Sequence, residues 1–369
     1  MHSAAEPFFP TDYPSILGRI ASIDPITYGK TRNYTDGAVT RLSPYIARGL
    51  ISTQQVAQAV MARGYKPYQI ESFLQELAWR DYFQQVWIAK GAYINTDLKQ
   101  AQQPVNNYGL PLAVQQAATG ISAIDEAIRQ LYTTGYMHNH VRMYVAALCC
   151  NIARSHWQQP ARWMYYHLLD ADWASNALSW QWVAGSFSSK KYVANQENIN
   201  KYCHSTQRGT FLDVPYEAFE HLEVPAVLQA TLQPQWQTVL PQPAPLQLQA
   251  NLPVYVYNFY NLDPTWDAEV EANRVLLLEP AMFEQYPISE ATLSFVLALG
   301  QNTPGLQVCT GSFEQLQAQC GSAVIHYKEH PLNAHYRGTE HPRQWLCPQV
   351  QGYYPSFFSY WKKCRKHLF

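Results

Sequence analysis

Residues 170–182 read Asp-Ala-Asp-Trp-Ala-Ser-Asn-Ala-Leu-Ser-Trp-Gln-Trp, and this stretch is the most informative part of the chain. It gathers two aspartates, an asparagine and three tryptophans in a sequence that is only 14% charged. Buried polar groups need hydrogen-bond partners and buried charges need opposite charges, so such a cluster is costly without them. The upstream segment 136–143 (YMHNHVRM) supplies a candidate partner in Arg142. Together the two segments predict a site for a large, flat aromatic cofactor with polar edges.

The composition describes a globular chain of 369 residues, long enough for a substantial core and for two domains. No apolar run approaches the length that spans a membrane, and the start MHSAAEPFFP lacks the features of a signal peptide. We therefore expect a cytoplasmic protein without a membrane partner. The seven cysteines form no Cys-x-x-Cys pair, which favours reduced and mostly buried thiols.

The formal net charge of −1 conceals an asymmetry along the chain. Through Pro215 there are 18 Lys and Arg against 14 Asp and Glu, whereas the remainder has 8 against 13. A mildly basic first part permits a nucleic-acid partner, but the excess is too small to establish one.

The first part of the chain has the apolar spacing of helices, as in Ile70, Phe73, Leu74 and Leu77. The predicted helices cover residues 53–62, 68–88, 121–132, 137–155 and 160–170. Runs of β-branched residues are scarce there, which argues against a sheet. Residues 1–223 are therefore predicted to form one mostly helical domain.

The character of the sequence changes after residue 223. Residues 224–252 are rich in proline and glutamine, as in a linker. Residues 253–369 then alternate short strands with helices, which predicts a small, partly parallel α/β unit. The predicted strands are 254–259, 274–278, 306–309 and 323–327, and the predicted helices are 288–299 and 313–319. The basic end at 362–366 is interpreted as solvated, with a DNA- or lipid-facing role as the alternative.

Five blocks in a fixed order identify a family resemblance. They are 41–45 (RLSPY), 76–83 (ELAWRDYF), 119–131 (TGISAIDEAIRQL), 136–143 (YMHNHVRM) and 170–182. Residues from about 28 to 215 resemble the FAD-binding helical domain of the photolyase/cryptochrome family. The resemblance covers about half of the chain and implies a mostly α-helical fold that binds FAD.

The resemblance implies roles for the polar cluster. Arg142 and Asp170 are similar to an ion pair beside the isoalloxazine ring, where a guanidinium would favour the anionic reduced flavin. Asp172 is similar to a carboxylate that meets polar groups of the bent cofactor. Asn176 holds the position that faces flavin N5, where an amide can both donate and accept. The remaining cofactor contacts implied are Tyr28, Thr40, Leu42, Ser43, Arg80 and Asn139.

The phosphate-side segment departs from the family in one place. The family commonly has Thr-Ser where this chain has Val39-Thr40, so one hydroxyl is missing. Without the resemblance, Thr40 or Ser43 would be interpreted as a helix N-cap.

Substrate-side residues also match the members that repair cyclobutane pyrimidine dimers. Glu76 is similar to the carboxylate that hydrogen-bonds the flipped lesion, and Trp79 and Trp182 to the aromatics that line its pocket. Asn139 and Met143 complete this set. Members that repair the (6-4) lesion carry a second histidine where this chain has Asn139, which favours the cyclobutane lesion. Taken alone, Trp79 and Met143 would be core residues at helical spacing.

The family also implies a chain of electron-transferring tryptophans. Trp180 and Trp157 match its first two positions, and with Glu76 and Asn176 they complete the residues implied in catalysis. The third position falls near Pro104, where no tryptophan stands. Tyr108 is close in sequence and is a candidate substitute.

Two further departures set expectations about cofactors. The family's N-terminal antenna domain is expected to be absent, so no antenna chromophore is predicted. Residues 191–203 resemble the iron–sulfur branch, but the second cysteine of the local pair is missing after Cys203. We therefore predict no iron–sulfur cluster and no metal.

These observations support two main hypotheses. The first is a light-driven repair enzyme that splits pyrimidine dimers in single- or double-stranded DNA by electron transfer from reduced FAD. The second is a cryptochrome-like blue-light photosensor that acts on a protein partner. A structural relic that binds no flavin is a third possibility.

Overall fold

The computed structural model describes residues 8–369, so residues 1–7, which contribute to the prediction about a signal peptide, lie outside it. The chain divides into two compact units. The helical unit comprises Asp24–Val39 and Tyr82–Trp236. The sheet unit comprises the described residues up to Ile23, Thr40–Asp81 and Gln237–Phe369. These units are not contiguous in sequence, and the predicted domain bounds at 223 and 253 remain a prediction.

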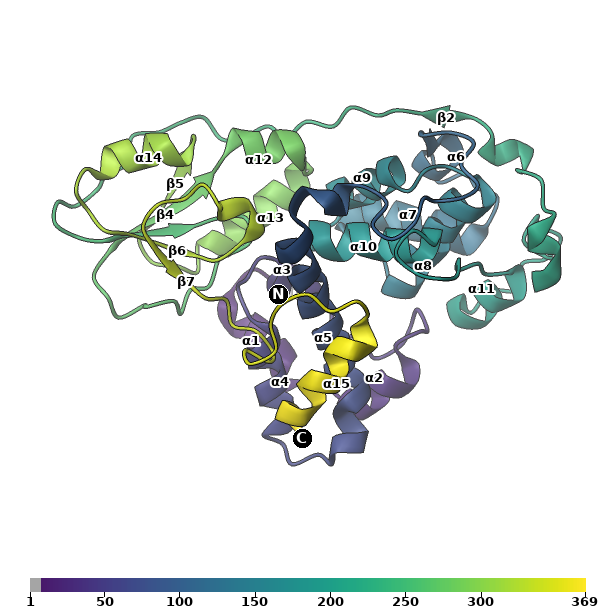
Figure 1. Cartoon of the computed structure of the whole chain (residues 1–369), viewed down its shortest axis with the longest axis horizontal. Helices are drawn as coiled ribbons and strands as arrows, with labels where there is room; N and C mark the ends of the chain where they lie inside the picture. The colour runs from purple at the N-terminus through teal and green to yellow at the C-terminus, as the bar shows by residue number, and fades with distance from the viewer. Residues whose placement is uncertain (1–7) are drawn as a thin grey trace, which may run out of the picture. The chain divides into compact units, whose positions relative to one another are not determined.

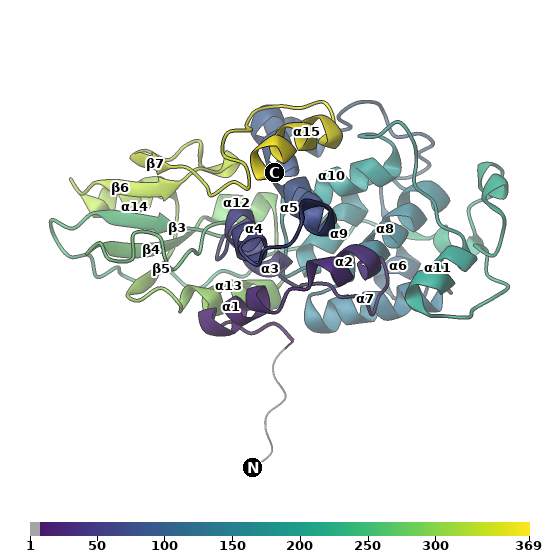
Figure 2. The same cartoon turned by 90° about the horizontal axis from the view of Figure 1, so that it is seen from below.

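Helices form the bulk of the helical unit, as the apolar spacing predicts. Its α-helices are α2 (Pro25–Thr31), the C-terminal part of α5 (Pro67–Lys90), α6 (Leu112–Gln115), α7 (Ser122–Thr134), α8 (Asn139–Ala147), α9 (Gln158–His167), α10 (Trp173–Ala184) and α11 (Gln196–Cys203). Shorter helical turns are η1 (Gly91–Asn95), η2 (Leu148–Ile152), η3 (Tyr216–Glu220) and η4 (Ala226–Leu228). Helix α10 packs against both α8 and α9, and α7 packs against α8, a grouping visible in Figure 2.

The helical unit contains one short pair of strands, although the sequence argued against a sheet there. Strand β1 (Leu110–Pro111) pairs antiparallel with β2 (Thr231–Leu232). Each strand has two residues, too few to produce an alternating pattern in the sequence. The rest of the predicted linker at 224–252 is mostly irregular.

Gly135 shapes the turn that leads from α7 to α8. It ends α7 with a left-handed φ of 67°, a conformation that glycine adopts without a steric penalty. Its carbonyl accepts a hydrogen bond of 2.9 Å from the amide of Leu169. A Cβ atom at residue 135 would lie 2.5 Å from Cγ of Leu169. The segment 168–170 therefore approaches this turn more closely than any side chain on residue 135 would allow.

The sheet unit holds a five-stranded sheet in the order β5-β4-β3-β6-β7, and every neighbouring pair is parallel (Figures 1 and 2). The strands are β3 (Val254–Tyr257), β4 (Asn273–Leu278), β5 (Leu306–Thr310), β6 (Ile325–Lys328) and β7 (Thr339–His341). On one face Val254, Val256 and Val275 pack with Phe313 and Leu316 of α14. Four of the strands match the predicted ones, whereas the short, polar β7 was not predicted.

The other helices of the sheet unit precede, separate or follow these strands in the sequence. They are α1 (Tyr13–Ala21), α3 (Ser43–Ala47), α4 (Thr53–Met61), α12 (Pro280–Gln285), α13 (Glu290–Gly300), α14 (Phe313–Cys320), the turn η5 (Pro331–Asn333) and α15 (Phe357–Leu368). Helix α15 buries Phe357, Tyr360, Trp361 and Cys364 and exposes its basic residues. It contacts the N-terminal part of α5, where Arg365 pairs with Glu71 at 2.8 Å.

Replacing Gly135 with alanine should destabilise the protein more than the same change at Gly120. Both glycines have a positive φ, but a Cβ at Gly120 meets nothing within 4 Å. Gly120→Ala should therefore lower the free energy of unfolding only through the strain of a left-handed backbone, by roughly 1–2 kcal/mol. Gly135→Ala should add the collision with Leu169, roughly 1–3 kcal/mol more. Urea denaturation measures the difference, and equal losses for the two variants would contradict the close approach.

Candidate functional site

The centre of the site is an ion pair between α8 and the segment that precedes α10. Nη1 of Arg142 donates to Oδ2 of Asp170 and Nη2 donates to Oδ1, both at 3.0 Å. Nε of Arg142 donates to the carbonyl of Met137 at 2.8 Å. The side chains of Arg142 and Asp170 are 19% and 7% exposed. This is the planar, two-bond geometry in which a guanidinium binds a carboxylate most specifically.

Asp172 acts first as the N-cap of α10. Its carboxylate accepts from the amide of Ala174 at 3.2 Å and from the hydroxyl of Ser175 at 3.0 Å. Nε2 of Gln84, on α5, donates to the same carboxylate at 2.7 Å. The residue is 2% exposed, so these bonds stabilise a charge that burial would otherwise disfavour. This capping role is observed, while contact between Asp172 and a cofactor remains a prediction.

Asn176 lies one turn into α10. Its Nδ2 donates to the carbonyl of Ala161, on α9, at 2.7 Å. This bond fixes the direction of the amide plane. Within the described residues, Oδ1 of Asn176 accepts no hydrogen bond, so the side chain retains an acceptor that can serve a ligand.

The other predicted residues of the helical unit are spread over three helices. Tyr28 lies on α2 and is partly buried. Asn139 and Met143 lie one turn apart on α8, the first exposed and the second partly buried. Trp182 lies on α10, is 39% exposed and has its ring centroid 6.2 Å from that of Tyr192. Because α8 and α10 pack together, Asn139, Met143 and Trp182 come from neighbouring helices.

The phosphate-side segment belongs to the sheet unit. Thr40 accepts a hydrogen bond of 3.4 Å on its hydroxyl from the amide of Leu42, which is buried. Ser43 begins α3, and that helix has no side-chain cap. The capping interpretation of Thr40 and Ser43 is therefore wrong for α3, while their contact with a phosphate stays a prediction.

Glu76, Trp79 and Arg80 lie on α5 at the spacing of one helical face, and all three are partly buried. The ring of Trp79 is stacked on Phe357 of α15, with centroids 3.7 Å apart and planes at 9°. Sequence reasoning missed Phe357, because the two residues are far apart in the chain and nothing in the pattern links them. One face of the predicted substrate tryptophan is thus covered by the chain's own side chain.

Asp81 anchors the same part of α5. It accepts from the hydroxyl of Thr53 at 3.0 Å and from the amide of Leu346 at 2.7 Å. Burial raises the pKa of Asp81 to about 6, although these hydrogen bonds oppose the shift. Sequence reasoning missed this residue too, because a single aspartate within a helix gives no signal of its partners.

The two tryptophans of the predicted electron path, Trp157 and Trp180, do not stack on each other. Trp157 is fully buried, and its ring centroid lies 6.4 Å from that of Trp173. Trp180 is 2% exposed and makes no ring contact with Trp157 among residues 8–369. Tyr108 is 65% exposed, and its ring lies 5.3 Å from that of His156. The structure thus places Tyr108 beside the residue that precedes Trp157.

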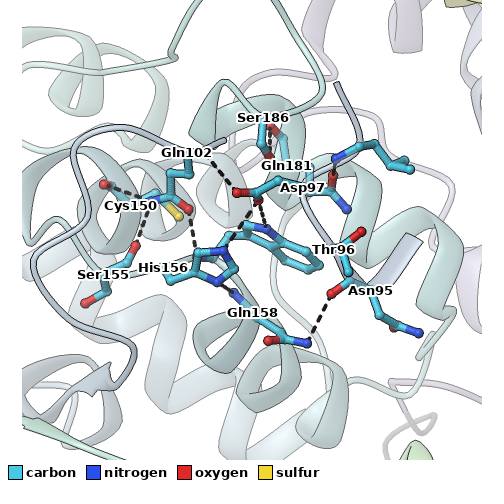
Figure 3. A network of polar contacts seen from close by, with 12 residues as sticks. Asn95, Thr96, Asp97, Gln102, Cys150, Ser155, His156, Gln158, Gln181 and Ser186 are labelled. Atoms are coloured by element: carbon cyan, nitrogen blue, oxygen red, sulfur yellow. Dashed lines mark hydrogen bonds and ion pairs between the residues drawn. The ribbon is translucent and has the colours of Figure 1, made fainter. Parts of the chain in front are cut away.

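A polar network surrounds the indole of Trp157 (Figure 3). Its Nε1 donates to Oδ1 of Asp97 at 2.8 Å. Oδ2 of Asp97 accepts from the amide of Gln102 at 2.9 Å, and Oε1 of Gln102 accepts from the amide of Trp157 at 2.9 Å. These bonds hold the buried ring in one orientation.

The donor set around the ion pair fits a flavin. Arg142 has five N–H groups and uses three of them on Asp170 and Met137. In the described part of the chain, its other two make no hydrogen bond. Together with Oδ1 of Asn176, these groups offer donors and an acceptor from α8 and α10. The carbonyl and ring-nitrogen edges of an isoalloxazine ring match both the donors and the acceptor.

The family of the helical region follows from comparison with known proteins. Residues 73–213 match the family described as the FAD binding domain of DNA photolyase. This region belongs to the photolyase/cryptochrome family. The family match includes α7 to α11, and with them the two helices that carry Arg142 and Asn176.

Individual photolyases and cryptochromes are similar over the same region. The deoxyribodipyrimidine photo-lyase of Alkalihalophilus pseudofirmus is 30% identical over 148 residues, 39% of this chain and 31% of that protein. That of Streptomyces griseus is 31% identical over 166 residues, 43% and 36% of the two chains. Cryptochrome DASH of Danio rerio is 30% identical over 210 residues, 51% and 36%. The chain thus spans about a third of the length of these relatives.

A solved cryptochrome of Synechocystis sp. PCC6803 has a TM-score of 0.49 and 25% identity, over 53% of this chain and 44% of its own. Among residues 8–369, no helix is long and apolar enough to cross a membrane.

Removing the charge of Asp170 should destabilise the fold strongly. Asp170→Asn keeps the shape but leaves the Arg142 guanidinium without its counter-charge. Breaking a buried pair costs about 3–5 kcal/mol, and the partial exposure of Arg142 reduces this to roughly 2–4 kcal/mol. The exposed pair of Arg129 and Glu126, with side chains 57% and 76% exposed, is the control. Glu126→Gln should change the free energy of unfolding by less than about 0.5 kcal/mol.

His167, at the end of α9, should make the protein sensitive to acid. Burial lowers the pKa of His167 to about 4 from 6.5, since burial disfavours the charged ring. Below pH 6.5 the unfolded chain binds a proton that the folded chain excludes, so stability falls as the pH drops toward 4. The loss should reach roughly 3 kcal/mol at most. Urea denaturation between pH 7 and 4 should show a shallower decline for His167→Gln, and parallel curves would contradict this role of His167.

Proposed function

We propose that this protein is a light-driven DNA repair flavoenzyme that splits cyclobutane pyrimidine dimers by electron transfer from reduced FAD. The observation that carries the proposal is the Arg142–Asp170 pair with its two remaining N–H groups on α8. Reduced FAD supplies the light absorption and the electron when it is bound. The family match over residues 73–213 supports the choice of this cofactor.

The chain's own residues would hold the flavin in its electron-donating form. Arg142 would favour a negative charge on the ring, because a nearby guanidinium stabilises an anion. Asp170 would keep that guanidinium in place. Asn176 would meet the N5 edge with an amide whose direction is fixed by its bond to Ala161. The phosphate side would be held by Tyr28, Thr40, Leu42 and Ser43, with Arg80 and Asn139 contributing further contacts.

The substrate would be DNA in which the damaged pair of bases is flipped out of the stack. Flat apolar walls and a few polar groups suit a flipped dimer, and Trp79, Trp182 and Met143 are walls of that type. Glu76 would hydrogen-bond the edge of the lesion. Asn139, in the place of a second histidine, favours the cyclobutane lesion over the (6-4) lesion. Affinity for DNA should fall as salt rises, because counterions compete for the phosphates.

A second candidate function is a blue-light photosensor without repair activity. The observation that favours it is the stacking of Phe357 on Trp79, which covers a face that the repair hypothesis assigns to the lesion. The similarity to a cryptochrome DASH over 51% of the chain supports it as well. In this function, illumination would change how a protein partner binds.

Repair of a thymine-dimer oligonucleotide under blue light tests the first function. The reduced, FAD-loaded protein should split the dimer in the light and leave it intact in the dark. Glu76→Ala should lower the yield of splitting per absorbed photon by about a hundredfold, the lower end of the range found when one hydrogen bond to the reacting group is lost from a closed site. Glu71→Ala is the matched control, because Glu71 lies on the same helix but pairs with Arg365.

The same experiment separates the two candidates. Splitting that is absent in flavin-loaded protein, with equal affinity for damaged and undamaged DNA, contradicts repair and favours the photosensor. Splitting that survives Glu76→Ala unchanged leaves the repair function standing but removes Glu76 from it.

A further inference from the structure

Positive charge is concentrated at the C-terminal end of the chain. Residues 341–369 contain five Lys and Arg and no Asp or Glu, whereas residues 216–340 contain three Lys and Arg against 13 Asp and Glu. Four of the five cations lie on α15, a helix of 12 residues. A cluster of this kind on one short element is typical of a surface that binds a polyanion.

The three lysines of α15 share its exposed face. Lys362 and Lys366 are four residues apart, so their side chains start about 5–6 Å from each other, and Lys363 precedes Lys366 by three. Among residues 8–369, none of the three lysines forms an ion pair. The fourth cation, Arg365, pairs with Glu71 at 2.8 Å. The helix therefore presents three uncompensated positive charges to solvent.

The helix dipole accounts for only some of these cations. The basic residues of the last turn are Arg365, Lys366 and His367, where they meet the negative end of the dipole. Lys362 and Lys363 precede that turn, and the effect of the dipole falls off within the last turn. An external partner of opposite charge explains these two lysines better than helix stability does.

Exposed aromatic rings accompany the lysines. Phe358 is 70% exposed and lies one turn before Lys362. Tyr353, in the loop before the helix, is 43% exposed. Surfaces that bind nucleic acids combine cations for the backbone with rings on which bases stack. The outer face of α15 has both.

The buried face of α15 argues against a membrane as the partner. A helix that lies on a bilayer inserts its apolar face among the lipids. In α15 that face is packed inside the protein and at most 4% exposed, and it consists of Phe357, Tyr360, Trp361 and Cys364. Mostly cationic groups are left for a partner, which suits the phosphates of DNA in water.

The position of α15 is fixed beside a residue that the proposed function assigns to the lesion. The helix lies along the N-terminal part of α5 (Figure 1). Phe357 stacks on Trp79, with ring centroids 3.7 Å apart. A capping box between Ser356 and Ser359 begins the helix. The lysine face therefore starts within two helical turns of the ring that covers Trp79.

We propose that α15 is a DNA-binding element in which Lys362, Lys363 and Lys366 contact phosphates of the substrate strand. This inference rests on the proposed function, from which it takes DNA as the substrate. Helix α15 lies outside residues 73–213, the region that matches the family of FAD-binding domains. Phosphate contacts position DNA without reading its bases, so α15 raises the affinity for damaged and undamaged DNA alike.

Fluorescence anisotropy with labelled DNA, with and without a thymine dimer, tests the proposal. The variant K362Q/K363Q/K366Q removes three charges and keeps residues that favour a helix. It should bind both DNAs about tenfold or more weakly at low salt. The slope of log affinity against log salt should fall in magnitude by about two to three. The ratio of the two affinities should stay as in the wild type.

A control variant separates the place of the charges from their number. K30Q/K190Q/K201Q removes three exposed lysines of the helical unit that form no ion pair in the described part of the chain. Its net charge equals that of the α15 variant. Its affinity for DNA should stay within about twofold of the wild type. Equal weakening in the two variants would overturn the assignment to α15.

Acetylation of the wild-type protein tests the same contact without a substitution. Bound DNA should protect Lys362, Lys363 and Lys366 from an acetylating reagent severalfold, as measured by mass spectrometry, and should leave Lys30 reactive. Lysines of α15 that react equally with and without DNA would contradict the proposal, even if the triple variant did not fold.

The outcomes separate this inference from the proposed function. DNA affinity and salt slope that survive K362Q/K363Q/K366Q would overturn the role of α15 and leave the repair function standing. Binding that depends on α15 but leads to no dimer splitting would support α15 and contradict repair. Binding to vesicles that contain phosphatidylserine, lost in the α15 variant while its DNA affinity is unchanged, would overturn DNA as the partner.

Discussion

The bidentate ion pair between Arg142 and Asp170 is the constraint on which the candidate site depends. It joins α8 to the segment before α10, and both charges are largely removed from water. Such a pair is stable only if its geometry is good and its remaining groups are satisfied. The turn at Gly135 helps to place Asp170. The Gly135 carbonyl accepts a hydrogen bond from the amide of Leu169, and the lack of a Cβ atom lets the segment 168–170 come close. The two N–H groups that Arg142 does not use internally are what make the pair useful to a ligand.

Three aspartates of the helical unit have distinct tasks because their surroundings differ. Asp170 balances a guanidinium, Asp172 caps α10 and binds Gln84, and Asp97 accepts from the indole of Trp157. All three are fixed by hydrogen bonds, so none needs a large rearrangement to act. In the proposed function, the first would hold the guanidinium that meets the flavin, and the second would order the helix that carries Asn176.

The sequence predicted α4, α5, α7, α8, α9, α13 and α14, and it predicted four strands of the sheet from short apolar runs in the C-terminal part of the chain. The cost of buried charge predicted a partner for the aspartates in the segment 136–143, whereas the specific pairing of Arg142 with Asp170 was implied by the family resemblance. It did not predict the contact of Trp79 with Phe357 or the bonds of Asp81 to Leu346, since these join residues distant in the chain. The strand β7 was missed because its exposed polar residues have no pattern. Tyr108 could be named as a candidate but not placed, because the loop that carries it has no periodicity.

In the proposed function, the helical region holds FAD against Arg142. A fluorescence titration of the purified protein with FAD, beside Arg142→Met, tests it most directly, since methionine fills similar space without charge or N–H donors. We expect saturable binding of about one FAD per chain in the wild type and much weaker binding in a variant that remains folded by circular dichroism. Wild-type protein that is colourless and shows no saturable FAD binding would contradict the claim.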